Sequence, residues 1–262
     1  MRASLILVGR WCRRALALLG RVCRLNVELA AKTVELPRKN LWLLGRLTAD
    51  QVRFTGVQAL PLVAGSAALV GCVAILQTMS LLTGVADELI GVILVGIIVR
   101  EVGPLIAAAV LIGRSGTAMA TELGSMRLSG ELDALRAYRI DPLDFVVLPR
   151  VAGMVISLFG LIVCFDLVGI LGGFGIALML KDISFALLRA RVLAALTNAD
   201  LVLTAFKALA FGQVVAILCC HYGLEVRRST TELPQAVTRA VVASMVSVLA
   251  IDSVLTAAFY LL

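Results

Sequence analysis

Long apolar runs dominate the pattern along this chain. Five of them, at about residues 61–82, 89–121, 146–180, 201–222 and 236–262, consist almost wholly of hydrophobic residues. Each is about 20 residues or longer, which at about 1.5 Å rise per residue is enough to cross roughly 30 Å of hydrocarbon. The pattern therefore predicts an all-α polytopic membrane protein with five transmembrane helices.

Two of these runs contain residues that disturb a straight helix. Gly103 and Pro104 interrupt the second run, and proline lacks the N–H that an α-helix uses for hydrogen bonding. The third run is too long for one straight crossing, and Gly169 and Gly172 are places where it can bend or break. We expect both runs to depart from simple rods.

The first 58 residues have a different character. Arginine interrupts their short apolar patches, so none is long enough to span a membrane or to serve as the core of a signal peptide. From Pro37 to Phe54, leucines recur among basic residues, and Trp42 is a typical anchor at the level of the headgroups. We expect residues 1–58 to be a basic membrane-surface segment with an interfacial amphipathic helix, and residues 59–262 to be the five-span domain.

The polar interval between the second and third runs predicts a short helix. Ser129 is a suitable N-cap, Glu131 and Asp133 follow in the first turn, and Arg136 lies in the last turn. The dipeptide Asp141–Pro142 then ends the helical pattern.

One face of this helix, at about residues 129–140, is apolar. Leu128, Leu132 and Leu135 recur at the spacing i, i+4, i+7. Such a helix between two spans is suited to docking on a soluble partner. The alternative is an ordinary loop helix that lies on lipid headgroups.

Basic residues indicate the orientation in the membrane. The first 58 residues and the intervals near residues 122–150 and 223–239 are rich in arginine, whereas the opposite side holds only Lys181, Arg189 and Arg191. Positive residues concentrate on the cytoplasmic side of membrane proteins. We therefore predict a cytoplasmic N-terminus, a periplasmic C-terminus and a cytoplasmic helix at 129–140.

Composition and motifs exclude several classes of protein. The chain has 262 residues, 61% of them hydrophobic, with a mean hydropathy of +1.02, which a soluble domain rarely reaches. Its net charge of +7 then points to anionic lipid headgroups, not to nucleic acid. The scattered cysteines and the single histidine, His221, predict no metal site. There is no P-loop motif, so any ATP hydrolysis belongs to a partner subunit.

Charged residues at membrane depth are the strongest candidates for function. A charge at the bilayer centre costs about 2.5–3.5 kcal/mol on the insertion scale, so these groups should pair inside the bundle or face water. We predict a buried network with opposite charges that either braces the helices or contains a proton-carrying carboxylate. Its members are Glu101, Lys207, Asp252 and Asp166.

A series of spaced motifs resembles the MlaE/YrbE permease family. The similarity runs from about residue 40 to the end of the chain. The motifs that carry it are Arg100-Glu101-x-Gly103-Pro104, Gly113-Arg114-x-Gly116, Glu122-Leu123-Gly124, Asp133-Ala134-Leu135, Asp141-Pro142, Pro149-Arg150 and Asp252-x-x-Leu255-Thr256.

This resemblance implies a function and a set of partners. Members of the family are membrane subunits of ABC transporters that move phospholipids between the inner and outer membranes of Gram-negative bacteria and so maintain outer-membrane lipid asymmetry. They work as homodimers with a cytoplasmic pair of P-loop ATPase subunits and a periplasmic MCE-domain protein that binds substrate. By this resemblance the chain is a permease subunit of the bacterial inner membrane, with no catalytic residue or cofactor of its own.

The resemblance also suggests roles for particular residues. The helix at 129–140 becomes a coupling helix to the ATPase, and Arg100, next to Glu101 on the lipid pathway, becomes the candidate for binding the lipid phosphate. The expected coupling residues are Glu131, Leu132, Asp133, Leu135 and Arg136.

Two other classes of protein compete with this interpretation. In a proton-coupled secondary transporter of a small or lipidic solute, Glu101, Asp166 or Asp252 would bind protons. A membrane enzyme acting on lipids is disfavoured, because the sequence has no cluster of catalytic residues.

Overall fold

The computed structural model describes residues 41–81, 95–180, 185–226, 229 and 231–261, and every regular element among them is helical. Five stretches are long and apolar enough to cross a membrane: Leu44–Thr78, Val95–Leu128, Leu143–Ile176, Asn198–Glu225 and Glu232–Phe259. The predicted all-α polytopic fold with five spans is therefore confirmed. Residues 1–40 lie outside the described residues, so the basic surface segment there stays a prediction.

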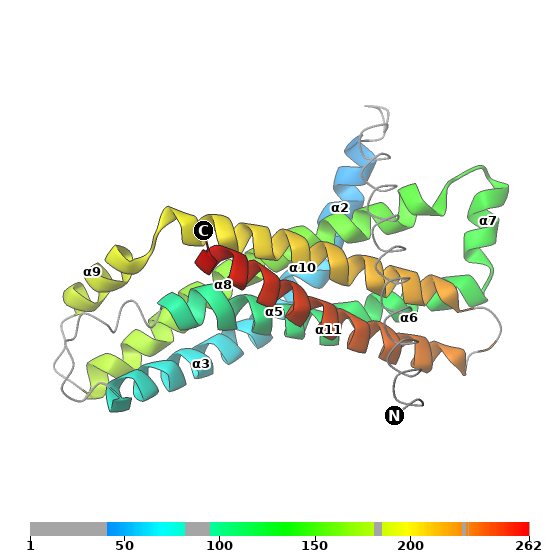
Figure 1. Cartoon of the computed structure of the whole chain (residues 1–262). Helices are drawn as coiled ribbons and strands as arrows, with labels where there is room; N and C mark the ends of the chain where they lie inside the picture. The colour runs from blue at the N-terminus through cyan, green and yellow to red at the C-terminus, as the bar shows by residue number, and fades with distance from the viewer. Residues whose placement is uncertain (1–40, 82–94, 181–184, 227–228, 230, 262) are drawn as a thin grey trace, which may run out of the picture.

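The first span is preceded by the expected amphipathic helix. Helix α2 (Leu41–Thr55) leads through the short turn η2 (Val57–Ala59) into α3 (Leu60–Leu81), and Figure 1 shows α2 and α3 meeting at an angle. Trp42 is exposed on α2, with the guanidinium of Arg46 over its ring at 5.9 Å. Helix α2 packs along α8, the helix of the third span.

The second span changes its helical winding along its length. It consists of η3 (Val95–Val102), α5 (Gly103–Leu111), η4 (Ile112–Gly116) and α6 (Thr117–Leu128), and both η3 and η4 are π-helical. The predicted departure from a simple rod is confirmed here. Such π-helical segments are frequent at functional sites.

The third span corrects one expectation. After η5 (Leu143–Val147), helix α8 (Leu148–Leu180) continues without a break through Gly169 and Gly172. A Cβ atom on Gly71 of α3 would lie 1.9 Å from the carbonyl oxygen of Gly169, and one on Gly172 would lie 3.1 Å from the oxygen of Ala68. The glycines of α8 do not break it; they let α3 approach backbone to backbone.

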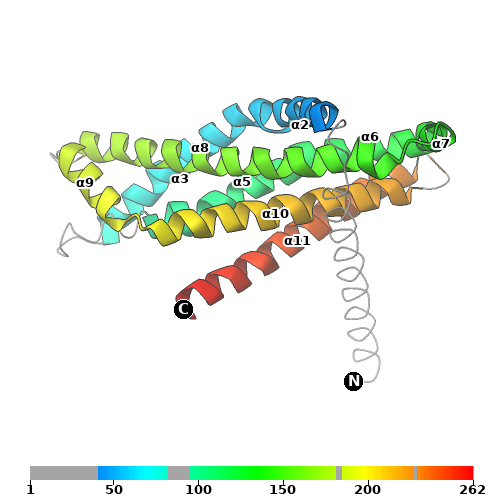
Figure 2. The same ribbon diagram turned by 90° about the horizontal axis from the view of Figure 1, so that it is seen from above.

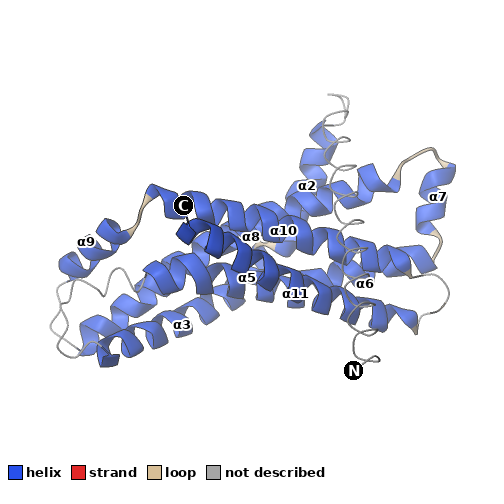
Figure 3. Cartoon of the chain, in the orientation of Figure 1, coloured by secondary structure: helices blue, strands red, loops and turns tan. Residues whose placement is uncertain are grey.

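The remaining helices complete the bundle. Between the third and fourth spans lies α9 (Phe185–Ala195); α10 (Asn198–Glu225) and α11 (Glu232–Leu261) form the last two spans. Helix α10 packs against α8, α6 and α11, and α11 lies at the outside of the bundle (Figure 2). Helices and loops make up the described residues (Figure 3), and α7 (Glu131–Ala137) and α9 mark opposite ends of the bundle, called here the α7 end and the α9 end.

Candidate functional site

Lys207 of α10 is the centre of a buried polar network. Its side chain is 0% exposed, and its Nζ lies 2.6 Å from Oδ1 of Asp252 on α11 and 3.6 Å from Oε2 of Glu101 on η3. The ammonium group also donates hydrogen bonds to Oγ1 of Thr256, at 3.0 Å, and to the main-chain oxygen of Arg100, at 2.7 Å. The structure thus brings together three of the predicted network residues, from the second, fourth and fifth spans.

Thr256 completes the network from α11. Its hydroxyl accepts a hydrogen bond from Lys207 and donates one to Oε1 of Glu101, at 2.9 Å. A buried ion pair is stable only when such additional hydrogen bonds satisfy the remaining polar atoms. Thr256 was not predicted as a site residue, although it lies four residues after Asp252 and so on the same face of a helix.

The main-chain bond to Arg100 lies where the winding of the second span changes. Arg100 belongs to the π-helical η3, in which a carbonyl accepts from the N–H five residues later, and α5 begins at Gly103. Pro104 has no N–H, so it cannot compete for this oxygen through an α-helical bond. Lys207 Nζ supplies a donor to it from α10.

The side chain of Arg100 forms a separate pair. Its Nε lies 2.8 Å from Oδ1 of Asp200, its Nη2 donates to Oδ2 at 3.3 Å, and its guanidinium lies 5.5 Å from the ring of Phe259. The side chain of Asp200 is 0% exposed. This pair engages two of the three guanidinium nitrogens, and the expected role of Arg100 in binding a lipid phosphate stays a prediction.

Asp200 is a site residue that the sequence analysis missed. It lies in the first turn of α10 and forms a capping box with Thr197, whose N–H donates to Asp200 Oδ2 at 2.9 Å. The spacing Thr-x-x-Asp before an apolar run is a signal for such a cap. The predicted fourth span began one residue later, which left Asp200 outside it.

Asp166 is not brought into the network. Its Oδ1 lies next to the backbone of Gly103, where an added Cβ would be 2.5 Å away. This oxygen is buried and has no hydrogen-bond partner among the described residues.

The predicted coupling helix is shorter than expected. Helix α7 spans Glu131–Ala137, and its N-cap is Gly130, which has a φ of 79°. Glycine tolerates this left-handed conformation, whereas Ser129, the predicted N-cap, instead ends α6 and donates to Glu131 Oε1 at 2.8 Å.

The apolar face of α7 points into its own chain. Leu132 is 2% exposed, and the half-buried Leu135 packs against the core. Asp133 pairs with Arg127 at 3.1 Å and with Arg136 at 3.2 Å. The side chains that are exposed in this region are therefore not those of the predicted apolar face. One of them is Tyr138, which is 80% exposed.

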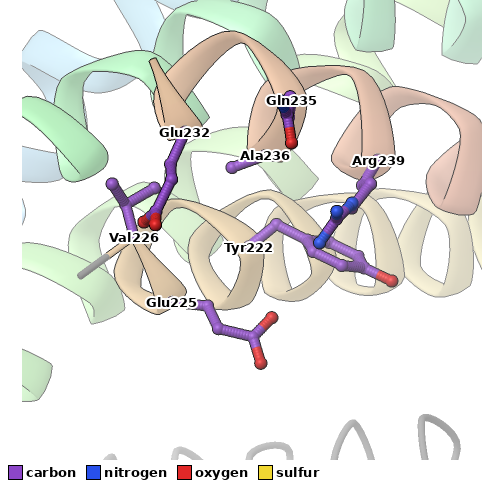
Figure 4. Close-up of a pocket in the computed structure, with 7 residues that line it drawn as sticks. All are labelled: Tyr222, Glu225, Val226, Glu232, Gln235, Ala236 and Arg239. Carbon is purple, nitrogen blue, oxygen red and sulfur yellow. The ribbon is translucent and has the colours of Figure 1, made fainter. Parts of the chain in front are cut away.

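Two cavities lie near the α7 end. One, of about 550 Å³, lies between α10 and α11, and Figure 4 shows the guanidinium of Arg239 directed toward the ring of Tyr222. The other, of about 520 Å³, is open to the outside and is lined by residues of α2, α6, α7, η5 and α8; we call it the α2 cavity. Its polar lining residues are Asp50, Gln51, Glu122, Ser125, Glu131 and Arg150.

Comparison with known proteins decides the family. The model of the family described as "Permease MlaE" matches residues 48–258, which include all of α3 to α10 and nearly all of α11. The chain belongs to the MlaE permease family. It is thus a membrane permease subunit, in agreement with the resemblance of its motifs.

Relatives of this MlaE-family chain come from distant organisms. A probable ABC transporter permease protein of Synechocystis sp. is 32% identical over 206 residues, which cover 78% of each chain. The intermembrane phospholipid transport system permease protein MlaE of Haemophilus influenzae is 29% identical, over 82% of this chain and 83% of the relative. The chloroplastic protein TRIGALACTOSYLDIACYLGLYCEROL 1 of Arabidopsis thaliana is 30% identical, over 82% of this chain and 62% of the relative.

Proposed function

We propose that this chain is the permease subunit of an ABC transporter that moves phospholipids between the inner and outer membranes and supports outer-membrane lipid asymmetry. The observation that carries the proposal is the family match over residues 48–258. The name of the Haemophilus relative, an intermembrane phospholipid transport system permease, supports the substrate class.

The proposed complex lies in the bacterial inner membrane. Two copies of the chain form a dimer, a cytoplasmic P-loop ATPase pair binds near α7, and an MCE-domain protein binds on the periplasmic side. The N-terminus is cytoplasmic and the C-terminus periplasmic. ATP is used by the partner, because this sequence contains no P-loop.

The helix connectivity supports a route for coupling. Helix α7 directly follows α6, which is the last part of the second span, so a movement of α7 is transmitted to that span. The same span carries Glu101 and the main-chain oxygen bound by Lys207. The network ties that span to the fourth and fifth spans. In this proposal the ion pairs transmit movement between these helices. The exposed faces of the helices carry large apolar side chains, which can contact the acyl chains of a lipid.

A reconstituted transport assay tests the proposal. The full chain is placed in vesicles with its ATPase and MCE-domain partners, and transfer of a fluorescent phospholipid to acceptor vesicles is followed with and without ATP. We expect ATP-dependent transfer. Transport by the chain alone under a proton gradient would instead identify a secondary transporter, and an absence of transfer under both conditions would contradict the proposed substrate.

A further inference from the structure

Arg114 of the second span is a cation held by neutral groups. It lies in the π-helical η4 and is half-buried. Its Nη2 donates a hydrogen bond to Oε1 of Gln58 at 2.8 Å, and its Nη1 donates to the main-chain oxygen of Phe54 at 3.4 Å. Arg114 forms no ion pair within the part of the chain that the structure describes. The guanidinium is therefore fixed in position, but no carboxylate there balances its charge.

One role of Arg114 is to cap α2. The last carbonyls of a helix lack donors inside it, and here Arg114 donates to Phe54 O while the hydroxyl of Ser115 donates to Thr55 O at 3.4 Å. A helix C-terminus carries only about half of an elementary negative charge, so the cap leaves part of the positive charge unbalanced.

The cap also leaves donors of Arg114 unused. A guanidinium has five N–H groups, and the bonds to Gln58 and Phe54 use one on each of two nitrogens. The third nitrogen, Nε, has no partner among the described residues and is not one of the buried polar atoms, so a ligand can reach it. Gln58 is exposed as well, and its Nε2 is a further donor beside the guanidinium.

The position of Arg114 along the span coincides with the lipid headgroups. The largely apolar part of the second span, residues 95–112, is about 27 Å long, which is close to the roughly 30 Å of a hydrocarbon layer. Arg114 follows at the end of this part that is nearer to α7, and the last turn of the amphipathic helix α2 lies beside it. The guanidinium is thus at the boundary between hydrocarbon and headgroups, where lipid phosphates lie.

Apolar side chains adjoin the guanidinium. Phe54 and Val57 are exposed near the end of α2. On the second span, Val110 and Ile106 lie about one and two turns before Arg114 on the same face, and both are half-buried. A ligand that matches these surroundings has an anionic group at the level of Arg114 and an apolar part toward the hydrocarbon.

We propose that the corner between the end of α2 and η4, called here the α2–η4 corner, binds the phosphodiester of a glycerophospholipid with a net negative charge, such as phosphatidylglycerol. The free N–H groups of Arg114 and the amide of Gln58 donate to the phosphate oxygens. A zwitterionic headgroup gains less, because no carboxylate is among the groups that hold Arg114. The lipid belongs to the leaflet at the α7 end. The site is separate from the Lys207 network and does not depend on which lipid the chain transports.

Lipid retention measured by native mass spectrometry tests the site. The purified full chain is incubated with equal, low amounts of phosphatidylglycerol and phosphatidylcholine. We expect the first lipid retained to be phosphatidylglycerol. In Arg114→Gln its retention should fall about tenfold, because charge-assisted hydrogen bonds to the phosphate are lost.

A second variant leaves the cap of α2 in place. Gln58→Glu puts a carboxylate next to Nη2 of Arg114, so the guanidinium gains an ion pair inside the chain. Retention of phosphatidylglycerol should again fall about tenfold, since the new charge balances the cation and repels the phosphate. Thermal stability in lipid-free detergent should not decrease. This variant decides the question if Arg114→Gln does not fold.

A matched control separates the site from a general effect of charge. Arg53→Gln removes an exposed arginine from the last turn of α2 that is not among the groups holding Arg114. It should leave retention nearly unchanged, because an exposed charge interacts weakly through water. Short-chain phosphatidylglycerol should displace the bound lipid, whereas inorganic phosphate at the same concentration should not.

Four outcomes would overturn the inference. Equal retention of the two lipids by the unmodified chain would remove the preference for a negative headgroup, and equal losses in Arg53→Gln and Arg114→Gln would indicate general attraction to a basic surface. Displacement by inorganic phosphate would make the corner a site for free anions. A Gln58→Glu variant that keeps its lipid but no longer dimerises would place a second copy of the chain at the corner.

Discussion

Lys207 is fully buried, and its ammonium group is surrounded by oxygen atoms from η3 and α11. A buried charge in this position is tolerated only because oppositely charged and hydrogen-bonding groups are held next to it. Removal of one partner leaves the others without compensation, whereas removal of a complete pair avoids the cost of desolvation.

The first prediction follows for Lys207→Ala. This substitution leaves Asp252 buried without its cation and should lower the stability of the folded protein by about 3–5 kcal/mol. Lys207→Met combined with Asp252→Leu should be milder. Thermal unfolding of the purified variants measures both effects, and a single variant as stable and active as the original chain would contradict the role of the network.

The second prediction concerns the pair of Arg100 and Asp200. Arg100→Ala should destabilise the protein, because the carboxylate of Asp200 is fully buried. Adding Asp200→Asn should restore part of the loss, since asparagine removes the charge and still accepts the N–H of Thr197. If Arg100→Ala keeps full thermal stability but loses bound phospholipid, the original assignment to the lipid phosphate is right.

The sequence predicts the charged network better than the arginine pair, for a physical reason. Glu101, Lys207 and Asp252 are interruptions of apolar runs, so their need for partners can be inferred from the cost of a charge in lipid. Asp200 lies at the boundary of a run, where a carboxylate is ordinary. Its burial depends on the packing of the second span against α10, which no local pattern specifies.

At the scale of elements, α7 has a buried and an exposed side with different roles. Leu132 is buried and holds the helix on its own chain, whereas Tyr138, which follows the last turn, is exposed. The leucine spacing predicted an amphipathic helix correctly, but periodicity alone does not say whether the same chain or a partner covers the apolar face.

The third prediction separates these two sides. Leu132→Asp should destabilise α7, because it places a carboxylate without a partner in the core. Tyr138→Ala should change stability by less than about 0.5 kcal/mol, as expected for an exposed site, and should weaken co-purification of the ATPase. Undiminished binding of the ATPase to the Tyr138 variant would place the contact elsewhere.

The fourth prediction concerns the contact of α3 with α8. Gly71→Ala forces a methyl group against the backbone of Gly169 and should cost about 1–3 kcal/mol or separate the helices. Gly65→Ala on the same helix is the matched control, because nothing lies within 4 Å of its added Cβ. Equal thermal stability of the two variants would show that the helices do not meet through these glycines.

At the scale of the whole molecule, the two ends of the bundle face opposite sides of a membrane if the five spans cross it in turn. Length and apolarity predicted the number of spans correctly. Their limits were less predictable: α2 leads almost directly into α3, so the first apolar stretch begins at Leu44, well before the predicted residue 61.

The fifth prediction is topological. In a cysteine-free background, Ser129→Cys at the α7 end and Asn198→Cys at the α9 end should react with a membrane-impermeant maleimide from opposite sides. Both positions are exposed. Labelling of Ser129→Cys only after the cytoplasmic face is made accessible would support a cytoplasmic α7, and labelling of both positions from one side would exclude the proposed topology.

The hydrogen bond from Lys207 to the main-chain oxygen of Arg100 has a consequence for genetics. Every amino acid at position 100 supplies that oxygen, so no codon change there can abolish the bond. Position 207 controls it instead, because the ammonium of the lysine is the donor. In a saturation mutagenesis screen, variants that lose this bond should therefore map to position 207, whereas variants at position 100 lose side-chain contacts such as the pair with Asp200.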